Sequence, residues 1–183
     1  MISPEKIATL TALHKARNAF HFVLGGYALM TTEPSASELA KYAVSIGNGH
    51  LVVSGKGEGP PLGGTGYRIE FRAALQQGEA TDVVERAFRY MLQTTYDIVA
   101  ERIGARSIQA ARTRHAWLRF AWRYRSAIAH GSTWKLDNAA GLPVTWRHLT
   151  IDASMNGQPV DGFMGWYDGL QLCAETINFV EQH

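Results

Sequence analysis

The segment with the clearest chemical potential is Arg125-Ser126-Ala-Ile-Ala-His130, which Gly131 follows. Histidine has an ordinary pKa of about 6.5, so near neutral pH its imidazole can both accept and release a proton. Arginine presents its N–H donors as a flat fork that matches the oxygens of a phosphate. Arg125 and His130 could therefore bind a phosphate ester and move a proton on it. The alternative is a structural histidine, because an imidazole at a helix C-terminus also interacts favourably with the last carbonyls.

Charge is distributed unevenly along the 183 residues. There are 18 Lys and Arg residues against 16 Asp and Glu, a net charge of +2. From Arg102 to Lys135, however, there are eight basic residues and no acidic one, while the rest of the chain carries ten basic and sixteen acidic residues. A segment of +8 in a body of −6 predicts an electropositive patch, and hence an anionic ligand such as RNA or another phosphate compound. The alternative is an interface that gathers arginines.

Composition excludes several classes of protein. With 46% hydrophobic and 19% charged residues, the chain can bury a core, and its length fits one domain over residues 1–183. No segment resembles a membrane-spanning helix or a signal peptide, so we expect a cytoplasmic protein without membrane contact. The lone Cys173 lies on an apolar helical face, which favours a buried thiol over a nucleophile. The seven histidines fit no metal-binding motif, so we expect no metal site and no cofactor.

Four main helices must position these side chains. Apolar periodicity and capping residues predict them over residues 4–30, 81–103, 107–130 and 162–181, with Ser3 as the first N-cap. Because a short connection follows residue 103, the second and third helices should pack as an antiparallel hairpin. The fold class is therefore mainly α, an up-and-down helical bundle.

Three further segments interrupt this bundle. A capping-box pattern at Ser35-Ala-Ser-Glu38 predicts a short helix to about Ile46. Residues 47–66 hold eight of the 18 glycines and predict a long Gly-rich loop insertion with a short strand at 50–54. A phosphate-binding P-loop is disfavoured there, because no Gly-Lys-Ser/Thr follows. Residues 133–152 predict a small β-hairpin, with strands 133–136 and 144–151 joined by a turn through 137–141.

A helical projection of residues 107–130 predicts one polar stripe beside an apolar arc. The stripe contains Arg112, Arg119, Arg123, Ser126 and His130. It is either a solvated face or a track for an anion. Phe120 lies away from the apolar arc, where it could stack a base. The aromatic cluster as a whole, Trp117, Phe120, Trp122 and Tyr124, is nevertheless more typical of core and interface packing.

Two arginines of the same helix, Arg114 and Arg125, project into the apolar arc. A buried guanidinium needs a carboxylate, an interface or a cleft. Asp97 and Glu101 are possible partners, but they lie opposite the main apolar face of helix 81–103. That placement argues against an intrachain pair. A two-fold interface with a second copy of the helix would satisfy Arg125 instead.

Arg125-Ser126-Ala-Ile-Ala-His130 resembles the Rx4-6H signature of HEPN domains, in which a small polar residue commonly follows the arginine and the histidine lies near the end of a bundle helix. The resemblance covers about residues 81–183. Arg123 also satisfies the looser spacing, so either arginine could be the functional one. Ser126 favours Arg125, because Tyr124 departs from the polar preference after Arg123.

The resemblance implies a metal-independent endoribonuclease, often dimeric, with two motifs meeting in a cleft between subunits. Many such proteins are toxins or phage-defence components, and a toxin implies an antitoxin partner. Arg125, Ser126 and His130 would be catalytic, and Arg112, Arg119 and Arg123 would hold flanking phosphates of the RNA. Attack by the ribose 2′-OH would leave a 2′,3′-cyclic phosphate and a 5′-hydroxyl. The alternative is a non-catalytic module of the same fold that binds RNA, a nucleotide or a protein.

Overall fold

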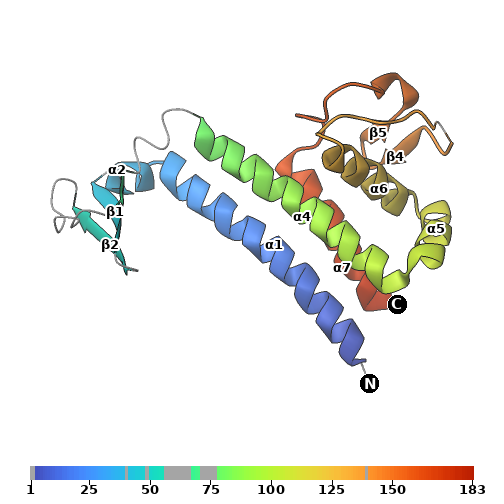
Figure 1. Cartoon of the computed structure of the whole chain (residues 1–183), viewed down its shortest axis with the longest axis horizontal. Helices are drawn as coiled ribbons and strands as arrows, with labels where there is room; N and C mark the ends of the chain where they lie inside the picture. The colour runs from blue at the N-terminus through green and yellow to red at the C-terminus, as the bar shows by residue number, and fades with distance from the viewer. Residues whose placement is uncertain (1–2, 40, 48–49, 56–66, 71–77, 139) are drawn as a thin grey trace. The chain divides into compact units, whose positions relative to one another are not determined.

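The computed structural model describes residues 3–39, 41–47, 50–55, 67–70, 78–138 and 140–183, which are mainly helical (Figure 1). They form two compact units, Met1–Phe20 with Phe88–His183, and His21–Ala87. Two long helices, α1 (Pro4–Thr31) and α4 (Glu79–Ile103), lie close to the bounds that capping residues and periodicity predicted. The Ser3 hydroxyl accepts a hydrogen bond from the Lys6 amide at 3.2 Å, which confirms the predicted N-cap.

The unit His21–Ala87 contains a three-stranded antiparallel sheet. After the short helix α2 (Ser35–Leu39) come β1 (Tyr42–Gly47), β2 (His50–Gly55) and β3 (Tyr67–Glu70), in the order β2-β1-β3. The strand expected at 50–54 is confirmed. The helix expected to run to Ile46 is wrong beyond Leu39, because the alternation of aromatic and β-branched residues from Tyr42 favours a strand. Residues 56–66 of the predicted Gly-rich loop lie outside the described residues.

The other unit contains the segment of predicted chemistry. Between α4 and the last helix α7 (Trp166–Gln182) lie α5 (Ala105–Arg114), α6 (Ala116–Ala129), β4 (Val144–Trp146), β5 (Leu149–Ile151) and a short 3-10 helix, η1 (Ala153–Met155). Gly104, with φ 80°, turns the chain back after α4. Among the described helices, none combines the length and the apolar character that crossing a membrane requires.

The single helix predicted over residues 107–130 is wrong, because it breaks at His115. This residue has extended backbone angles, φ −116° and ψ 108°, and separates α5 from α6. No Gly or Pro marks the break. The His115 ring instead packs edge-on against Phe179 of α7, with ring centroids 5.4 Å apart. Packing between helices therefore overrides local propensity, and Arg114, expected in the apolar arc, is exposed at the end of α5.

The predicted hairpin exists, but its strands pair differently. β4 pairs with β5, and the turn lies at Arg147 and His148 rather than at 137–141. The segment expected as the first strand pairs elsewhere: Trp134 donates its amide to Gln158, and Thr133 forms a bridge with Pro159. The segment directly after α6 is therefore not a strand of the hairpin, and β4 of the hairpin packs against α6.

The core of this unit gathers aromatic side chains between α6, the hairpin and the segment before α7. Phe120 is fully buried and lies against Trp146 and Phe163, at centroid distances of 5.4 and 6.1 Å. Phe120 therefore belongs to the core, the favoured interpretation of the aromatic cluster, and the alternative of an outward-facing base-stacking ring is wrong because elements after the helix cover that side. Tyr167, in the first turn of the last helix, is 69% exposed.

Helices α4 and α7 approach each other closely at one point. A Cβ atom on Gly169 would lie 2.1 Å from Cε2 of Phe88, so only glycine fits at that position. Leu172, Cys173, Ile177 and Val180 are buried along α7, with Met91 and Val99 buried on α4. The contact fixes α7 against the helix that also carries Asp97.

Candidate functional site

The predicted His130 lies at the C-terminal end of α6, with its side chain exposed. It caps the helix with φ −102° and ψ 37°, and its amide donates to the carbonyls of Ser126 and Ala127 at 3.1 and 3.2 Å. Gly131 and Ser132 then adopt φ 79° and 56°, which turns the chain sharply away from the helix axis. The imidazole is therefore accessible to a ligand, at the negative end of the helix dipole.

The predicted Arg125 forms a two-point ion pair with Asp97 of α4. Its Nε donates to Oδ1 at 2.8 Å and its Nη2 donates to Oδ2 at 3.0 Å. The two side chains are 32% and 43% exposed. Hydrogen bonding to Asp97 raises the pKa of Arg125, against a smaller effect of burial.

This pair corrects the expectation that Asp97 faces away from the rest of the chain. Arg112 of α5 and Arg125 of α6 reach this side of α4, where they bond to Tyr96 and Asp97, and Tyr96 is only 4% exposed. Helix α4 is thus packed on more than one side. A second copy of the chain is not needed to neutralise Arg125.

The predicted Arg112 joins three helices. Its Nε donates to the Tyr96 hydroxyl at 2.7 Å, and its Nη1 donates to Gln109 at 3.1 Å. Its guanidinium carbon lies 4.6 Å from the ring centroid of Trp122, within range of a cation–π interaction. Burial raises the pKa of Tyr96, and the hydrogen bond from Arg112 opposes that shift.

The predicted Arg123 is drawn into the protein rather than displayed on a polar stripe. It is 7% exposed, and its Nη2 donates to the carbonyls of Asn138 and Ala140, both at 2.9 Å. Its guanidinium carbon lies 4.6 Å from the Trp122 centroid. Burial lowers the pKa of Arg123, and the neighbouring Arg119 adds to that effect. Within the described residues, Arg123 has no carboxylate partner.

The predicted Arg119 lies half-buried under the same loop. Its Nε is buried and makes no hydrogen bond within the described chain. A Cβ on Gly141 would lie 3.4 Å from its Cδ, and Gly141 has φ 79°, so the loop needs glycine to pass over this side chain. Of the three arginines expected to hold phosphates, Arg119 is the least engaged.

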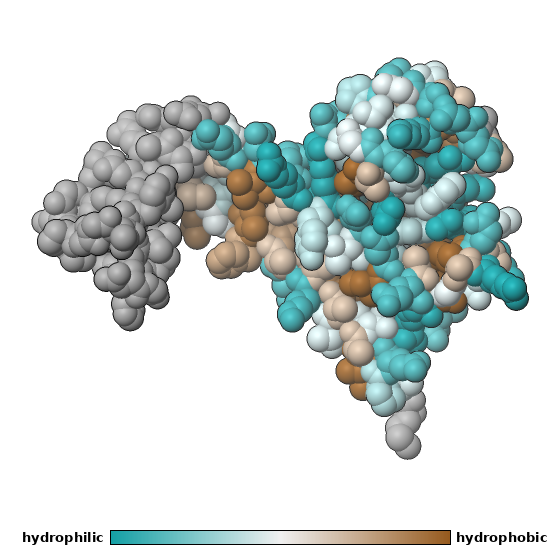
Figure 2. All heavy atoms as spheres, viewed as in Figure 1, coloured by the Kyte–Doolittle hydropathy of each residue, from teal (hydrophilic) through white to brown (hydrophobic). Residues whose placement is uncertain are grey.

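The structure therefore divides the predicted site into two groups. Arg125, Ser126 and His130 share the last turns of α6, while Arg112 and Arg123 contact Trp122. Ser126 is half-buried, and among the described residues its hydroxyl bonds to neither of the other two. The group at the end of α6 is the candidate site. Figure 2 shows mostly hydrophilic side chains over the region of α6 and the hairpin.

Sequence reasoning missed Arg89 of α4, which lies beside this group. Arg89 donates from Nη1 to the Ser132 hydroxyl at 2.7 Å and from Nη2 to Asp161 at 2.5 Å. In the sequence Arg89 is one of several charged residues of an amphipathic helix. That pattern does not indicate which loop the side chain reaches.

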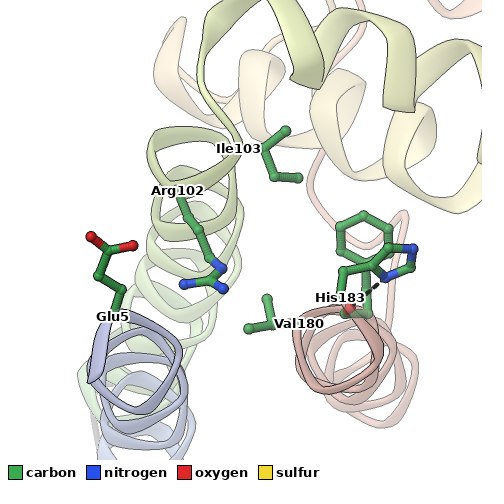
Figure 3. A pocket seen from close by; sticks show the side chains of 6 residues that line it. Glu5, Arg102, Ile103, Val180 and His183 are labelled. Carbon is green, nitrogen blue, oxygen red and sulfur yellow. Dashed lines mark hydrogen bonds between the residues drawn. The ribbon is translucent and has the colours of Figure 1, made fainter. Parts of the chain in front are cut away.

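Two hollows lie elsewhere in the same unit, one between α1, α4 and α7 (Figure 3) and one between α1 and α4. The one in Figure 3 has a volume of about 250 Å³, and Arg102, Glu5 and His183 are among the residues that line it. A neighbouring hollow of about 460 Å³ shares Glu5 and Arg102, and Arg102 donates to the Thr9 hydroxyl at 3.2 Å. Neither contains a predicted site residue. No cluster of three or more His, Cys, Asp or Glu side chains suited to a metal ion occurs in the described ranges.

Comparisons of the chain with models of protein families, with curated proteins and with solved structures found no match. The likeness to HEPN domains therefore rests on the residues at the end of α6 and on their placement in a helical protein.

Proposed function

We propose that this protein is a metal-independent endoribonuclease of the HEPN type, with its active site at the end of α6. The observation that carries the proposal is the sequence Arg125-Ser126-Ala-Ile-Ala-His130 at a helix C-terminus where His130 is exposed and a sharp turn follows. A phosphate-binding fork and a proton-exchanging group thus lie on the same two helical turns. Residues 102–135 around them contain eight basic residues and no acidic one, which favours an anionic substrate.

The proposed reaction is an internal transfer of the phosphoryl group. His130 removes the proton of the ribose 2′-OH, and the 2′-oxygen then attacks the adjacent phosphorus. The bond to the 5′-oxygen breaks, and that oxygen takes a proton, leaving a 2′,3′-cyclic phosphate and a 5′-hydroxyl. A homodimer would bring a second histidine to protonate the leaving oxygen. Arg125 stabilises the charge on the phosphate oxygens.

Arg125 is paired with Asp97 in this structure. The carboxylate occupies Nε and Nη2, so the Nη1 side of a guanidinium that is 32% exposed remains for a phosphate. A phosphate that binds there either shares Arg125 with Asp97 or displaces it. Arg119 has a buried Nε that makes no hydrogen bond within the described chain, so among the remaining arginines it is the one whose guanidinium is least committed, whereas Arg112 and Arg123 contribute through their positive charge.

The proposal extends to the partners that the HEPN resemblance implies. Such an enzyme would act as a homodimer with the motif near the subunit interface. It would serve as a toxin with a cognate antitoxin or as a phage-defence component.

A second candidate function is a non-catalytic module that binds RNA, a nucleotide or a protein. The observation that favours it is the commitment of the guanidiniums: Arg125 is paired with Asp97, and Arg123 is bonded to two carbonyls. In this case the end of α6 is structural, and binding relies on the exposed basic side chains.

Incubation of the purified protein with mixed RNA in EDTA tests the first function. The wild type and Arg114→Ala, which removes an exposed arginine of the same basic segment, should cleave RNA to 2′,3′-cyclic phosphate ends. His130→Ala and Arg125→Ala should both lose this activity. Equal cleavage by all four proteins would overturn the assignment. Salt-dependent binding of RNA without cleavage by the wild type would favour the second candidate.

A further inference from the structure

Arg89, Ser132 and Asp161 together hold the turn after His130, and we call these three residues the clamp. One guanidinium nitrogen donates to Ser132 at 2.7 Å, and the other donates to Asp161 at 2.5 Å. The two segments that it joins also pair directly, because the Val160 amide donates to the Ser132 carbonyl at 2.9 Å. Arg89 is 27% exposed and Asp161 is 61% exposed, so the bond to Ser132 is the better shielded one.

The turn needs such a clamp because its backbone is unfavourable. Gly131 has φ 79°, which glycine adopts freely, but Ser132 has φ 56°, which is uncommon for a residue with a Cβ. A serine in this conformation persists where neighbouring contacts hold it. The Arg89 bond to the Ser132 hydroxyl supplies one of these contacts, two residues after His130.

Two charged side chains of α4, of opposite sign, thus contact the two ends of the motif. Asp97 holds Arg125, and Arg89 holds the turn that follows His130. Residues eight apart on a helix lie about 12 Å apart along its axis. Since α4 is a rigid element, the separation between these two contacts is set by one helix rather than by a flexible loop.

We infer that Arg89 is a positioning residue for His130: it fixes the turn at Ser132 and thereby the direction of the imidazole relative to Arg125. The inference rests on the proposed function for its catalytic consequence. Small displacements of a reacting group reduce rates strongly, so losing the clamp should lower the turnover number with little change in KM.

Arg89→Gln tests this, with Arg86→Gln as the matched control, because Arg86 is an exposed arginine of the same helix. In Arg89→Gln, kcat for RNA cleavage should fall at least tenfold, and hydrogen exchange of the Val160 amide should accelerate at least tenfold. The NMR signal of His130 Hε1 should shift or broaden. Arg89→Lys, which keeps a positive charge and one set of donors, should restore part of each readout.

Two variants of Ser132 separate the loss of the hydroxyl bond to Arg89 from the backbone strain at position 132. Ser132→Gly removes the hydroxyl but accepts the positive φ, so it should lose about twofold to threefold in kcat. Ser132→Ala removes the hydroxyl and keeps the strain, so it should lose more. Because both variants remove the hydroxyl that Arg89 binds, wild-type kcat and wild-type Val160 exchange in Ser132→Gly would contradict the role of the clamp.

The readouts distinguish a failed positioning role from a failed function. If the wild type does not cleave RNA, the proposed function fails, while Val160 exchange and the His130 signal still report whether Arg89 holds the turn. Unchanged exchange and an unchanged His130 signal in Arg89→Gln would overturn the inference. A fall in kcat that only follows the fraction of unfolded protein, with the His130 signal intact, would also overturn it.

Discussion

Arg125 and Arg123 lie two residues apart on α6, yet the protein holds their charges by opposite means. Arg125 is 32% exposed and has a carboxylate on two of its nitrogens. Arg123 is 7% exposed and is held by two carbonyls and the ring of Trp122. The more buried cation is thus the one without an ionic partner in the described chain. An exposed pair can exchange its carboxylate for a phosphate, whereas a guanidinium sealed under a loop cannot do so without opening the loop.

The largest expected effect tests whether Arg125 is the chemically active member of the two. Arg125→Ala should lower kcat for RNA cleavage by about 100- to 1000-fold, because a donor to the transition-state charge is lost. Its free energy of unfolding should change by about 1 kcal/mol or less, since the pair with Asp97 is half-exposed. Cleavage assays and urea denaturation measure both. A large loss of stability with intact cleavage would reverse the roles of the two arginines.

The next effect concerns Arg123 and stability. Arg123→Ala should lower the free energy of unfolding by about 2 to 3 kcal/mol, because the Asn138 and Ala140 carbonyls lose their donor and Trp122 loses its packing partner. Arg123→Met keeps most of the packing and should lose less than Arg123→Ala. Denaturation curves of the two variants measure the difference. An Arg123→Ala protein as stable as the wild type would show that the buried guanidinium does not stabilise the fold.

A smaller effect should follow removal of the carboxylate. Asp97→Asn preserves the size of the side chain but frees the charge of Arg125, so RNA should bind about 3- to 10-fold more tightly at low salt and show a steeper salt dependence. Glu101→Gln is the control, because Glu101 is an exposed carboxylate on the same helix. RNA titrations at several salt concentrations provide the measurement. Equal tightening in both variants would mean that only net charge matters.

The smallest effect concerns Cys173, a buried group that, unlike Arg123, stays neutral in the folded protein by keeping its proton. Burial raises the pKa of the Cys173 thiol from 9.0 to about 11, so the folded protein keeps the thiol neutral. Between pH 9 and pH 11 the unfolded chain ionises this thiol and the folded protein does not, so stability falls as pH rises. Relative to Cys173→Ala, the wild type should lose about 1 kcal/mol between pH 8 and pH 10. Parallel pH profiles for the two proteins would contradict the raised pKa.

Much of the helical fold could be predicted from local signals. Ser3, Pro4 and Glu5 mark the start of α1, and apolar periodicity outlines α4 and the buried face of α7. The break at His115 carries no Gly or Pro signal, and the ring that His115 packs against lies on α7, far away in sequence, so it could not be predicted. β1 was missed because the helix predicted from the capping box of α2 was extended past Leu39, where the apolar periodicity changes to that of a strand.

The candidate site shows the same division. Arg125, Ser126 and His130 form a local motif, which a sequence can display. Their partners are not local: Asp97 was discounted because a projection of α4 alone takes no account of the helices that cover its second side. Arg123 was expected on a solvated stripe, and the loop that contains Asn138 buries it. A helical projection gives direction around one axis, but burial depends on which other elements lie in that direction.

The contact between Gly169 and Phe88 has a consequence for the search for distant relatives. The two positions are 81 apart in sequence, but a methyl group on one would overlap the ring of the other. Substitutions at these positions should therefore be coupled during evolution, with a smaller residue at position 88 required before any side chain is accepted at position 169. A glycine in α7 that accompanies an aromatic residue in α4 would identify chains with this helix spacing even where the segment around His130 has changed.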